Sequence, residues 1–102
     1  MPTYQLRRYL IQPTEMDNWL EEWRHEIVPL RERFGFRVEG AWVSREENRF
    51  VWVLSYDGED GLEAANDRYN ASPARMAMQP DPARHLIETE TMLMESALEP
   101  GG

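Results

Sequence analysis

Two neighbouring runs in the middle of the chain alternate between large apolar residues and polar or small ones. The first run covers residues 36–43, the second covers residues 50–56, and the polar stretch SREEN lies between them. Alternation with a period of two is typical of β-strands, so the pattern predicts a β-hairpin over residues 35–58. The even positions of the two runs hold Phe36, Val38, Gly40 and Trp42, and then Phe50, Trp52, Leu54 and Tyr56.

The number of residues in the hairpin turn decides which side chains share a face of the sheet. An odd number places all the even positions on one face, with Gly40 leaving room for a large neighbour, whereas an even number divides them between both faces. We expect the odd turn, because register is normally set by the pattern that keeps one face dry. The opposite face, with Ala41, Val43, Val51 and Val53, is then too apolar to be simply solvated.

The segments before the hairpin predict a strand followed by a long helix. Residues 3–11 form the strand, and Thr14 is a suitable N-cap for the helix. Pro29 predicts a kink near residues 25–29, because it lacks an N–H donor and its ring clashes with the carbonyl four residues earlier. Gly35 is placed to end the helix as its C′ residue. The apolar stripe of this helix consists of Met16, Leu20, Trp23, Ile27, Leu30 and Phe34, with Trp19 beside it.

The segments after the hairpin predict a second, weaker helix and a last strand. Residues 59–70 carry apolar side chains at helical spacing, and Ser72 followed by a proline predicts a short helical piece through residue 78. Residues 85–97 alternate again and are predicted to form the last strand. Residues 97–102 are expected to be a disordered tail.

The resulting order, β-α-β-β-α-β, matches the ferredoxin-like motif. We therefore predict an α+β fold with a four-stranded antiparallel sheet, in a single domain spanning residues 1–102. Right-handed crossovers place both helices on one face of such a sheet. The apolar opposite face then needs a cover, which a second copy of the chain would supply in a homodimer. The expected interface residues are Arg7, Tyr9, Val43, Val51 and Val53.

The composition argues against several classes of function. The chain has 19 acidic and 11 basic residues, and its net charge of −8 opposes binding to nucleic acid or to anionic membranes. It has no lysine and no cysteine, so Schiff-base and thiol chemistry are excluded. With two histidines and no close carboxylate triad, we expect no metal and no cofactor. No signal peptide or membrane-spanning stretch is recognisable, so we expect a cytoplasmic protein.

Large aromatic residues predict a pocket between the helices and the sheet. A flat apolar or aromatic ligand could lie among these side chains, and the alternative is that they pack against one another as an ordinary core. The predicted pocket residues are Trp19, Trp23, Trp42, Trp52, Tyr4 and Arg8.

Two residues are candidates for proton transfer. His85, at the start of the last strand, is the predicted general base, and Tyr56 is the second candidate. The alternative for His85 is a solvated residue at a strand end. His25 lies opposite the apolar stripe of the first helix and is expected at the surface.

Arg7 and Arg8 are adjacent on the first strand, so one of them points toward each face of the sheet. Each needs an acceptor, because an unpaired buried charge is costly. Glu88 and Glu90 on the neighbouring last strand are the natural partners. The alternative is that one arginine binds an anion at the pocket or at the dimer interface.

Several short motifs follow one another through about residue 70. They are Tyr4-Gln5-Leu6-Arg7-Arg8-Tyr9, Trp19 and Trp23, Pro29-Leu30, Arg33-Phe34-Gly35-Phe36, Gly40-Ala41-Trp42, and the segment from Trp52 to Tyr56. In order and spacing they resemble the NIPSNAP family of the dimeric α/β-barrel superfamily. The resemblance implies a dimeric barrel of ferredoxin-like subunits, but it implies no catalytic residues, because the family has no agreed catalytic set. The wider superfamily includes cofactor-independent monooxygenases, haem-degrading enzymes and small isomerases, which commonly use a cavity between helices and sheet.

Two functions from different classes agree with these features. The first is a non-catalytic homodimeric domain that binds a small apolar or aromatic molecule or a protein partner. The second is a cofactor-independent monooxygenase or isomerase acting on a small aromatic or apolar metabolite. A cavity of about 300 Å³ or more with His85 or Arg8 projecting into it would favour the enzyme, whereas a filled core would exclude it.

Overall fold

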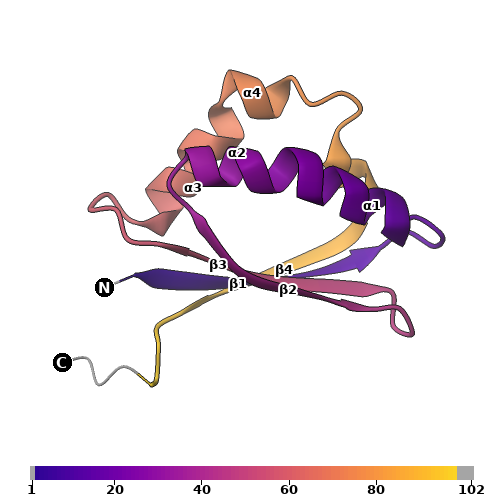
Figure 1. Ribbon diagram of the computed structural model, residues 1–102, viewed down its shortest axis with the longest axis horizontal. Helices are drawn as coiled ribbons and strands as arrows, with labels where there is room; N and C mark the ends of the chain where they lie inside the picture. The colour runs from indigo at the N-terminus through magenta and orange to yellow at the C-terminus, as the bar shows by residue number, and fades with distance from the viewer. Residues whose placement is uncertain (1, 99–102) are drawn as a thin grey trace.

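A computed structural model describes residues 2–98 and has the predicted order of elements (Figure 1). The strands are β1 (Thr3–Ile11), β2 (Arg37–Ser44), β3 (Arg49–Tyr56) and β4 (Leu86–Met94). The helical segments are α1 (Met16–Glu22), the π-helical turn η1 (Trp23–Ile27), α2 (Val28–Arg33), α3 (Leu62–Ala71), α4 (Pro73–Met76) and the 3-10 turn η2 (Pro82–His85). The last residues of the predicted tail, 99–102, lie outside the described residues.

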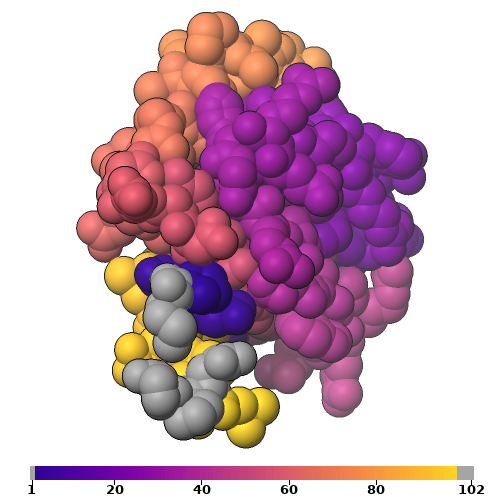
Figure 2. Space-filling model, turned by 60° about the vertical axis from the view of Figure 1, so that its left-hand side comes forward, coloured from indigo at the N-terminus to yellow at the C-terminus, as the bar shows by residue number. Residues whose placement is uncertain are grey.

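The four strands form one antiparallel sheet in the order β2-β3-β1-β4. All the helical segments lie on the same face of this sheet, with the continuous rod of α1, η1 and α2 above it (Figure 1). Figure 2 shows the end of this rod, in purple, packed beside the later helical segments in salmon and orange. The predicted α+β fold with a ferredoxin-like order is confirmed.

The core lies between the helical layer and the sheet. Trp19 and Trp23 from the rod meet Phe50 and Trp52 from β3, with ring centroids 5.0–5.7 Å apart and edge-to-face geometry. Such arrangements suit the quadrupoles of aromatic rings. Burying each side chain of this size contributes about 1.5–3 kcal/mol, so these aromatic contacts hold the two layers together.

A π-helical turn overlaps the region in which Pro29 predicts a kink. The N–H of Val28 donates to the carbonyl of Trp23, five residues earlier, so the turn contains one residue more than an α-helical turn. Pro29 follows directly, at a point where a regular helix would press its ring against the carbonyl of His25. The wider turn is therefore found where the proline disfavours α-helical geometry.

The ends of the helices agree only in part with the predicted caps. Gly35 has a φ of +89°, and the N–H of Phe36 donates to the carbonyl of Arg31 over 3.1 Å, which is the expected Schellman ending. Ser72 also caps α4, by accepting from the N–H of Arg75. Thr14 does not cap α1, because its φ of +68° places it in the preceding turn and the helix begins at Met16.

The hairpin contains a bulge that the alternating pattern did not indicate. Val38 lies opposite Leu54 as the odd turn requires, but the register shifts between Val38 and Gly40, and Trp42 lies opposite Val51. The loop between the strands accordingly holds four residues, 45–48. The prediction that Trp42 faces the helices is therefore wrong. Its indole lies on the outer face over Gly40, where a Cβ would approach Trp42 Cη2 to 2.6 Å.

The first strand presents its odd positions to the helices. Tyr9 lies opposite Phe50 and Arg7 lies opposite Trp52, and both odd residues therefore point into the helical side of the sheet. Val43 also lies opposite Phe50, on this same side. The predicted placement of Arg7, Tyr9 and Val43 on the outer face is wrong, whereas Val51 lies there as expected, opposite Arg8.

The outer face of the sheet has no helical cover among the described residues (Figure 1). Leu6, Val53 and Met92 lie side by side on this face, on the adjacent strands β1, β3 and β4. Trp42 extends the patch on β2 and is 60% exposed. None of the described helices is both long and apolar enough to cross a bilayer.

Candidate functional site

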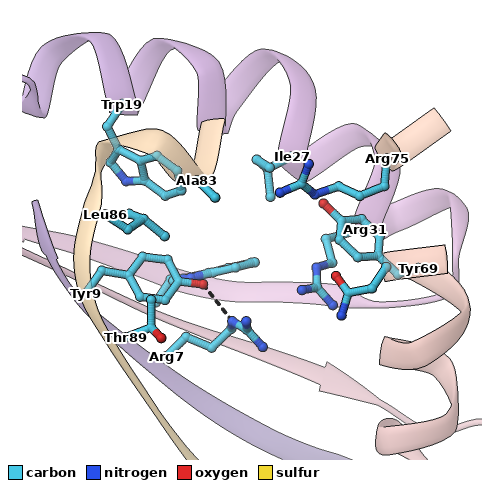
Figure 3. A pocket seen from close by; sticks show the side chains of 12 residues that line it. Arg7, Tyr9, Trp19, Ile27, Arg31, Tyr69, Arg75, Ala83, Leu86 and Thr89 are labelled. Carbon is cyan, nitrogen blue, oxygen red and sulfur yellow. Dashed lines mark hydrogen bonds between the residues drawn. The ribbon is translucent and has the colours of Figure 1, made fainter. Parts of the chain in front are cut away.

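A cavity of about 220 Å³ lies between the helical rod, the sheet and α3 (Figure 3). Strand β1 contributes Arg7 and Tyr9, and β3 contributes Trp52. Trp19 closes the cavity from the rod, and Thr89 of β4 lies at the opposite edge. A cavity therefore lies between helices and sheet as predicted, and of the predicted residues Trp19 and Trp52 line it.

Three aromatic side chains of the cavity wall have polar atoms without a protein partner. The indole nitrogens of Trp19 and Trp52 and the hydroxyl of Tyr69 are buried, and none of them has a hydrogen-bond partner among the described residues. A buried polar group left unpaired costs about 1–3 kcal/mol. Such groups gather in this wall, next to open space that can hold an acceptor.

Arg31 is a buried cation in the cavity wall, with only 3% of its surface exposed. Its Nη1 donates to Oδ1 of Asn66 on α3 over 2.7 Å, and its guanidinium carbon lies 3.8 Å from the centroid of the Tyr69 ring. Its Nε has no acceptor in the part of the chain that the structure describes. Burial, and then the charge of the nearby Arg7, lower the pKa of Arg31 to about 10, while Tyr69 and Tyr9 partly offset this shift.

Arg7 reaches the same cavity from the sheet. Its Nε donates to the hydroxyl of Tyr9 over 2.7 Å and its Nη1 donates to Oε1 of Gln5 over 2.8 Å. The guanidinium carbons of Arg7 and Arg31 each lie 5.9 Å from the centroid of the Trp52 ring. Neither arginine forms an ion pair with a carboxylate in residues 2–98.

Arg75 is the third arginine of the wall, and its charge is compensated. Its Nη2 lies 3.0 Å from Oδ1 of Asp81, which also accepts from the N–H of Ala83. Although burial alone would raise it, these hydrogen bonds and charges lower the pKa of Asp81. Burial also raises the pKa of the Tyr69 hydroxyl, so that side chain is a neutral donor at physiological pH.

The predicted pocket residues are divided between three places. Trp19 and Trp52 line the cavity, and Trp23 packs against Trp52 without lining it. Trp42, Tyr4 and Arg8 lie on the outer face of the sheet, so their assignment to the pocket is wrong. The even-numbered residues of β1 face away from the helices, which places Tyr4 and Arg8 outside, and the bulge in β2 turns Trp42 outward.

The predicted acceptors of the first-strand arginines are found only for Arg8. Its Nη1 lies 4.0 Å from Glu90 Oε2, and both side chains are largely exposed. Glu88 lies 3.9 Å from Arg49 instead of pairing with Arg7. An exposed pair of this kind contributes little, so the stabilising role expected of it is small.

His85 is buried at the joint between η2 and α1 and does not line the cavity. Its Nδ1 lies 2.6 Å from Oε1 of Glu15 and its Nε2 lies 3.0 Å from Oε2 of Glu22. Arg84 adds two hydrogen bonds to Glu22, at 2.9 and 2.7 Å. Both ring nitrogens of His85 are thus engaged in an arrangement that fastens the start of β4 to the first helix. Its catalytic role stays a prediction.

Tyr56 lies elsewhere and also stays a prediction as a catalytic residue. Its hydroxyl donates to Oδ1 of Asp60 over 2.7 Å and accepts from Arg68 over 3.1 Å, on the exposed side of the β3–α3 connection. His25 is exposed as expected, 3.3 Å from Glu21.

Arg31, Arg75 and Tyr69 are cavity residues that the sequence did not indicate. Arg31 follows Ile27 by four positions, so it falls on the edge of the apolar stripe of the first helix. A charged residue at the edge of an apolar stripe is the only sequence feature that could have indicated that Arg31 is buried. Tyr69 sits at helical spacing after Leu62, among the apolar positions of the second helix, and this spacing predicts nothing of its hydroxyl.

Comparison with known families and structures supports the fold. The model of the NIPSNAP family matches residues 4–96. An uncharacterised NIPSNAP domain protein from Burkholderia xenovorans is 22% identical, with a TM-score of 0.80 over 93% of this chain and 94% of its own. A NIPSNAP family protein from Agrobacterium tumefaciens is 14% identical, with a TM-score of 0.83 over 98% of each chain.

More distant structures share the fold as well. A putative antibiotic biosynthesis monooxygenase from Bacteroides thetaiotaomicron is 18% identical, with a TM-score of 0.71 over 94% of this chain and 90% of its own. Structural similarity at identities this low indicates a common fold, and it does not indicate that the proteins share an activity. No curated protein matches the sequence.

Proposed function

Because the chain belongs to the NIPSNAP family, whose similar structures share its helix-covered sheet, we propose that it is a homodimeric domain that binds a small molecule in the cavity between helices and sheet. The observation that carries this proposal is the group of unpaired donors in the cavity wall, namely Trp19 Nε1, Trp52 Nε1 and the Tyr69 hydroxyl. Ligand sites typically combine apolar walls with a few convergent polar groups.

The walls suit a ligand with a flat apolar body. Trp19 and Tyr9 meet edge to face, with centroids 5.7 Å apart, and Ile27 and Leu86 add aliphatic surface. A ring placed against these side chains keeps most of its surface out of water, while its polar atoms can accept from the indole and phenol donors. The cavity therefore favours an aromatic or cyclic molecule with acceptor groups.

Binding is favoured over catalysis by the positions of the candidate bases. The alternative enzyme, a cofactor-independent monooxygenase, is suggested by the likeness to structures described as antibiotic biosynthesis monooxygenases. Neither His85 nor Arg8 projects into the cavity, and its volume of about 220 Å³ is smaller than the size expected for the enzyme. If a substrate were found, loss of turnover in His85→Ala would support the catalytic alternative.

The homodimer follows from the uncovered face of the sheet. Leu6, Val53 and Trp42 form an apolar surface there, and a second sheet of the same shape would remove it from water. Sheets that pack face to face bury such residues at about 25 cal/mol per Å² of apolar area. The proposed partner of this domain is thus a second copy of itself.

Binding can be tested by ligand-observed NMR with a library of monocyclic aromatic fragments, followed by calorimetry on the hits. Ala83 lines the cavity and is exposed, so Ala83→Phe should obstruct it without disturbing the core. We expect at least a tenfold loss of affinity in this variant. Ala97→Phe, also at an exposed alanine, is the matched control and should bind normally. An absence of hits, or equal binding by both variants, would reject the proposal.

A further inference from the structure

We propose that the ligand of this cavity is a small aromatic carboxylate, and that Arg7 and Arg31 are the residues that bind its carboxylate group. The inference rests on the proposed binding function and adds the charge and size of the ligand. It starts from a contrast in charge: the whole chain is negative, whereas the cavity wall carries arginines.

The chain has 19 acidic residues against 11 basic ones, so carboxylates are plentiful. Several arginines use them: Arg75 pairs with Asp81, Arg84 with Glu22, and Arg45 with Asp17. Arg7 and Arg31 line the cavity, yet they pair with none of the carboxylates in the described part of the chain. Arg31 is buried and Arg7 is half-buried. A buried charge without a counter-ion is costly, so an anion supplied from outside would relieve a cost that the fold leaves in place at Arg31.

Both guanidinium groups are held in position by neutral partners. Asn66 and the ring of Tyr69 orient Arg31, while Gln5 and the hydroxyl of Tyr9 orient Arg7. These contacts leave Nε of Arg31 without an acceptor among residues 2–98. The hydrogen bonds to Asn66, Gln5 and Tyr9 use Nη1 of Arg31 and Nε and Nη1 of Arg7, so Nη2 of each arginine takes no part in them. Figure 3 shows the two groups facing the same space, one from the sheet and one from the helical side.

The chemistry of the free donors suits a carboxylate. The planar fork of an arginine matches the two oxygens of a carboxylate, and charge-assisted hydrogen bonds of this kind are the stronger ones. Both guanidinium carbons lie 5.9 Å from the centroid of the Trp52 ring, and two neighbouring positive charges also favour an anion. Burial, and then the charge of Arg7, lower the pKa of Arg31. The Tyr69 hydroxyl, a buried and neutral phenol whose pKa burial raises, can donate a further hydrogen bond.

The size of the cavity limits the rest of the ligand. An apolar cavity of about 150 Å³ is known to hold benzene. A cavity of about 220 Å³ therefore has room for one six-membered ring and a carboxylate. Trp52 and Trp19 form the apolar walls against which such a ring would lie.

The first experiment uses the unaltered protein with benzoate, its neutral isostere benzamide, and inorganic phosphate as probes. Calorimetry should show benzoate binding at least tenfold more tightly than benzamide. The ¹⁵N NMR signal of Arg31 Nε should shift with benzoate and stay in place with benzamide. Equal affinities for the two aromatic probes would overturn the carboxylate inference while leaving the binding function intact. Binding of phosphate in preference to benzoate would also overturn it.

The second experiment removes the charges one at a time. Arg31→Met and Arg7→Met keep an unbranched apolar stem, and each should weaken benzoate binding by about 10- to 100-fold while leaving benzamide binding within about twofold. Arg33→Met is the matched control, because it removes the same charge from an exposed position on the same helix. If benzoate binds all three variants equally, Arg7 and Arg31 are not the anion-binding residues. Circular dichroism verifies that each variant is folded, and the NMR shift in the unaltered protein tests the inference without any substitution.

Discussion

The guanidinium carbon of Arg31 lies 3.8 Å from the centroid of the Tyr69 ring, so a buried cation is stacked on a phenol in the wall of the cavity. The contact joins α2 to α3, the two helical segments that close this end of the fold over the sheet. Stacking of this kind contributes about 0.5–2 kcal/mol, which offsets only part of the cost of burying an unpaired charge. The site is therefore maintained at some expense to stability.

Arg31→Met should consequently raise the stability of the protein at pH 7 by about 1 kcal/mol. The pKa of Arg31 is about 10 in the folded state, well below its ordinary value, which corresponds to a charge penalty of about 3 kcal/mol. The variant removes that penalty and loses the Asn66 hydrogen bond and the Tyr69 stacking, worth about 2 kcal/mol together.

The measurement is urea denaturation of the variant beside the unaltered protein. Because the folded-state pKa is lowered, the penalty is present in full below about pH 9 and is relieved as the pH rises through 10 toward the ordinary pKa of arginine. Arg33→Met, at an exposed position, should change the free energy of unfolding by less than about 0.5 kcal/mol. A loss of more than about 2 kcal/mol in Arg31→Met would show that Arg31 is a structural residue.

His85→Ala should destabilise the fold by about 2–4 kcal/mol, as is usual when a buried polar network is broken. The substitution removes the link between Glu15, Glu22 and the start of β4. His25→Ala, at the exposed histidine, is the control and should have almost no effect. Thermal and urea denaturation at pH 7 would measure both. An unchanged midpoint for His85→Ala would contradict the structural role.

Stability should fall in acid because of Glu22. Burial alone would raise the pKa of this carboxyl, but hydrogen bonds from Arg84 and His85, together with their charges, lower it below 4.5. A lowered folded-state pKa gives stability that is present above the unfolded value and is lost as the pH falls through the folded one. Denaturation between pH 6 and pH 3 should therefore show a loss of free energy that is smaller in Glu22→Gln. Parallel curves for the two proteins would refute the role of Glu22.

Val53→Arg should convert the proposed dimer into monomers. Val53 lies opposite Leu6 and Gly40, near the middle of the outer face of the sheet, where an unpaired charge facing an identical copy would be costly. Sedimentation velocity at about 10 µM measures the outcome, and Glu63→Arg on the exposed side of α3 is the control. A monomeric unaltered protein at that concentration would reject the dimer.

The fold was predictable because its elements carry strong local patterns, whereas the faces of the strands were not. In β2 the small residues Gly40 and Ala41 fit either face, so nothing in the alternation marks the bulge that sends Trp42 outward. In β1 apolar residues occupy both odd and even positions, so the sequence does not show which set faces the helices. The contact of Tyr9 with Phe50, which decides the matter, joins residues about forty positions apart.

The candidate site was predictable only for its tryptophans. Trp19 and Trp52 were identified because large aromatics on facing elements usually meet. Arg31 was missed because a charged residue beside an apolar stripe is ordinarily solvent-facing, and its true surroundings come from α3, which follows it by 35 positions. The partners of His85 lie 63 and 70 positions earlier in the chain, beyond the reach of any local pattern.

The extra residue in the π-helical turn sets the direction in which α2 presents its side chains. Each residue of an α-helix advances the helix by about 100° around its axis. The π-helical turn takes one residue more than an α-helical turn, so without it Arg31 would be rotated by about 100° around the helix axis relative to Trp19. Its guanidinium would then leave the space that it shares with Arg7. The electropositive character of the cavity thus depends on a local irregularity of backbone winding as well as on the identity of the residues around it.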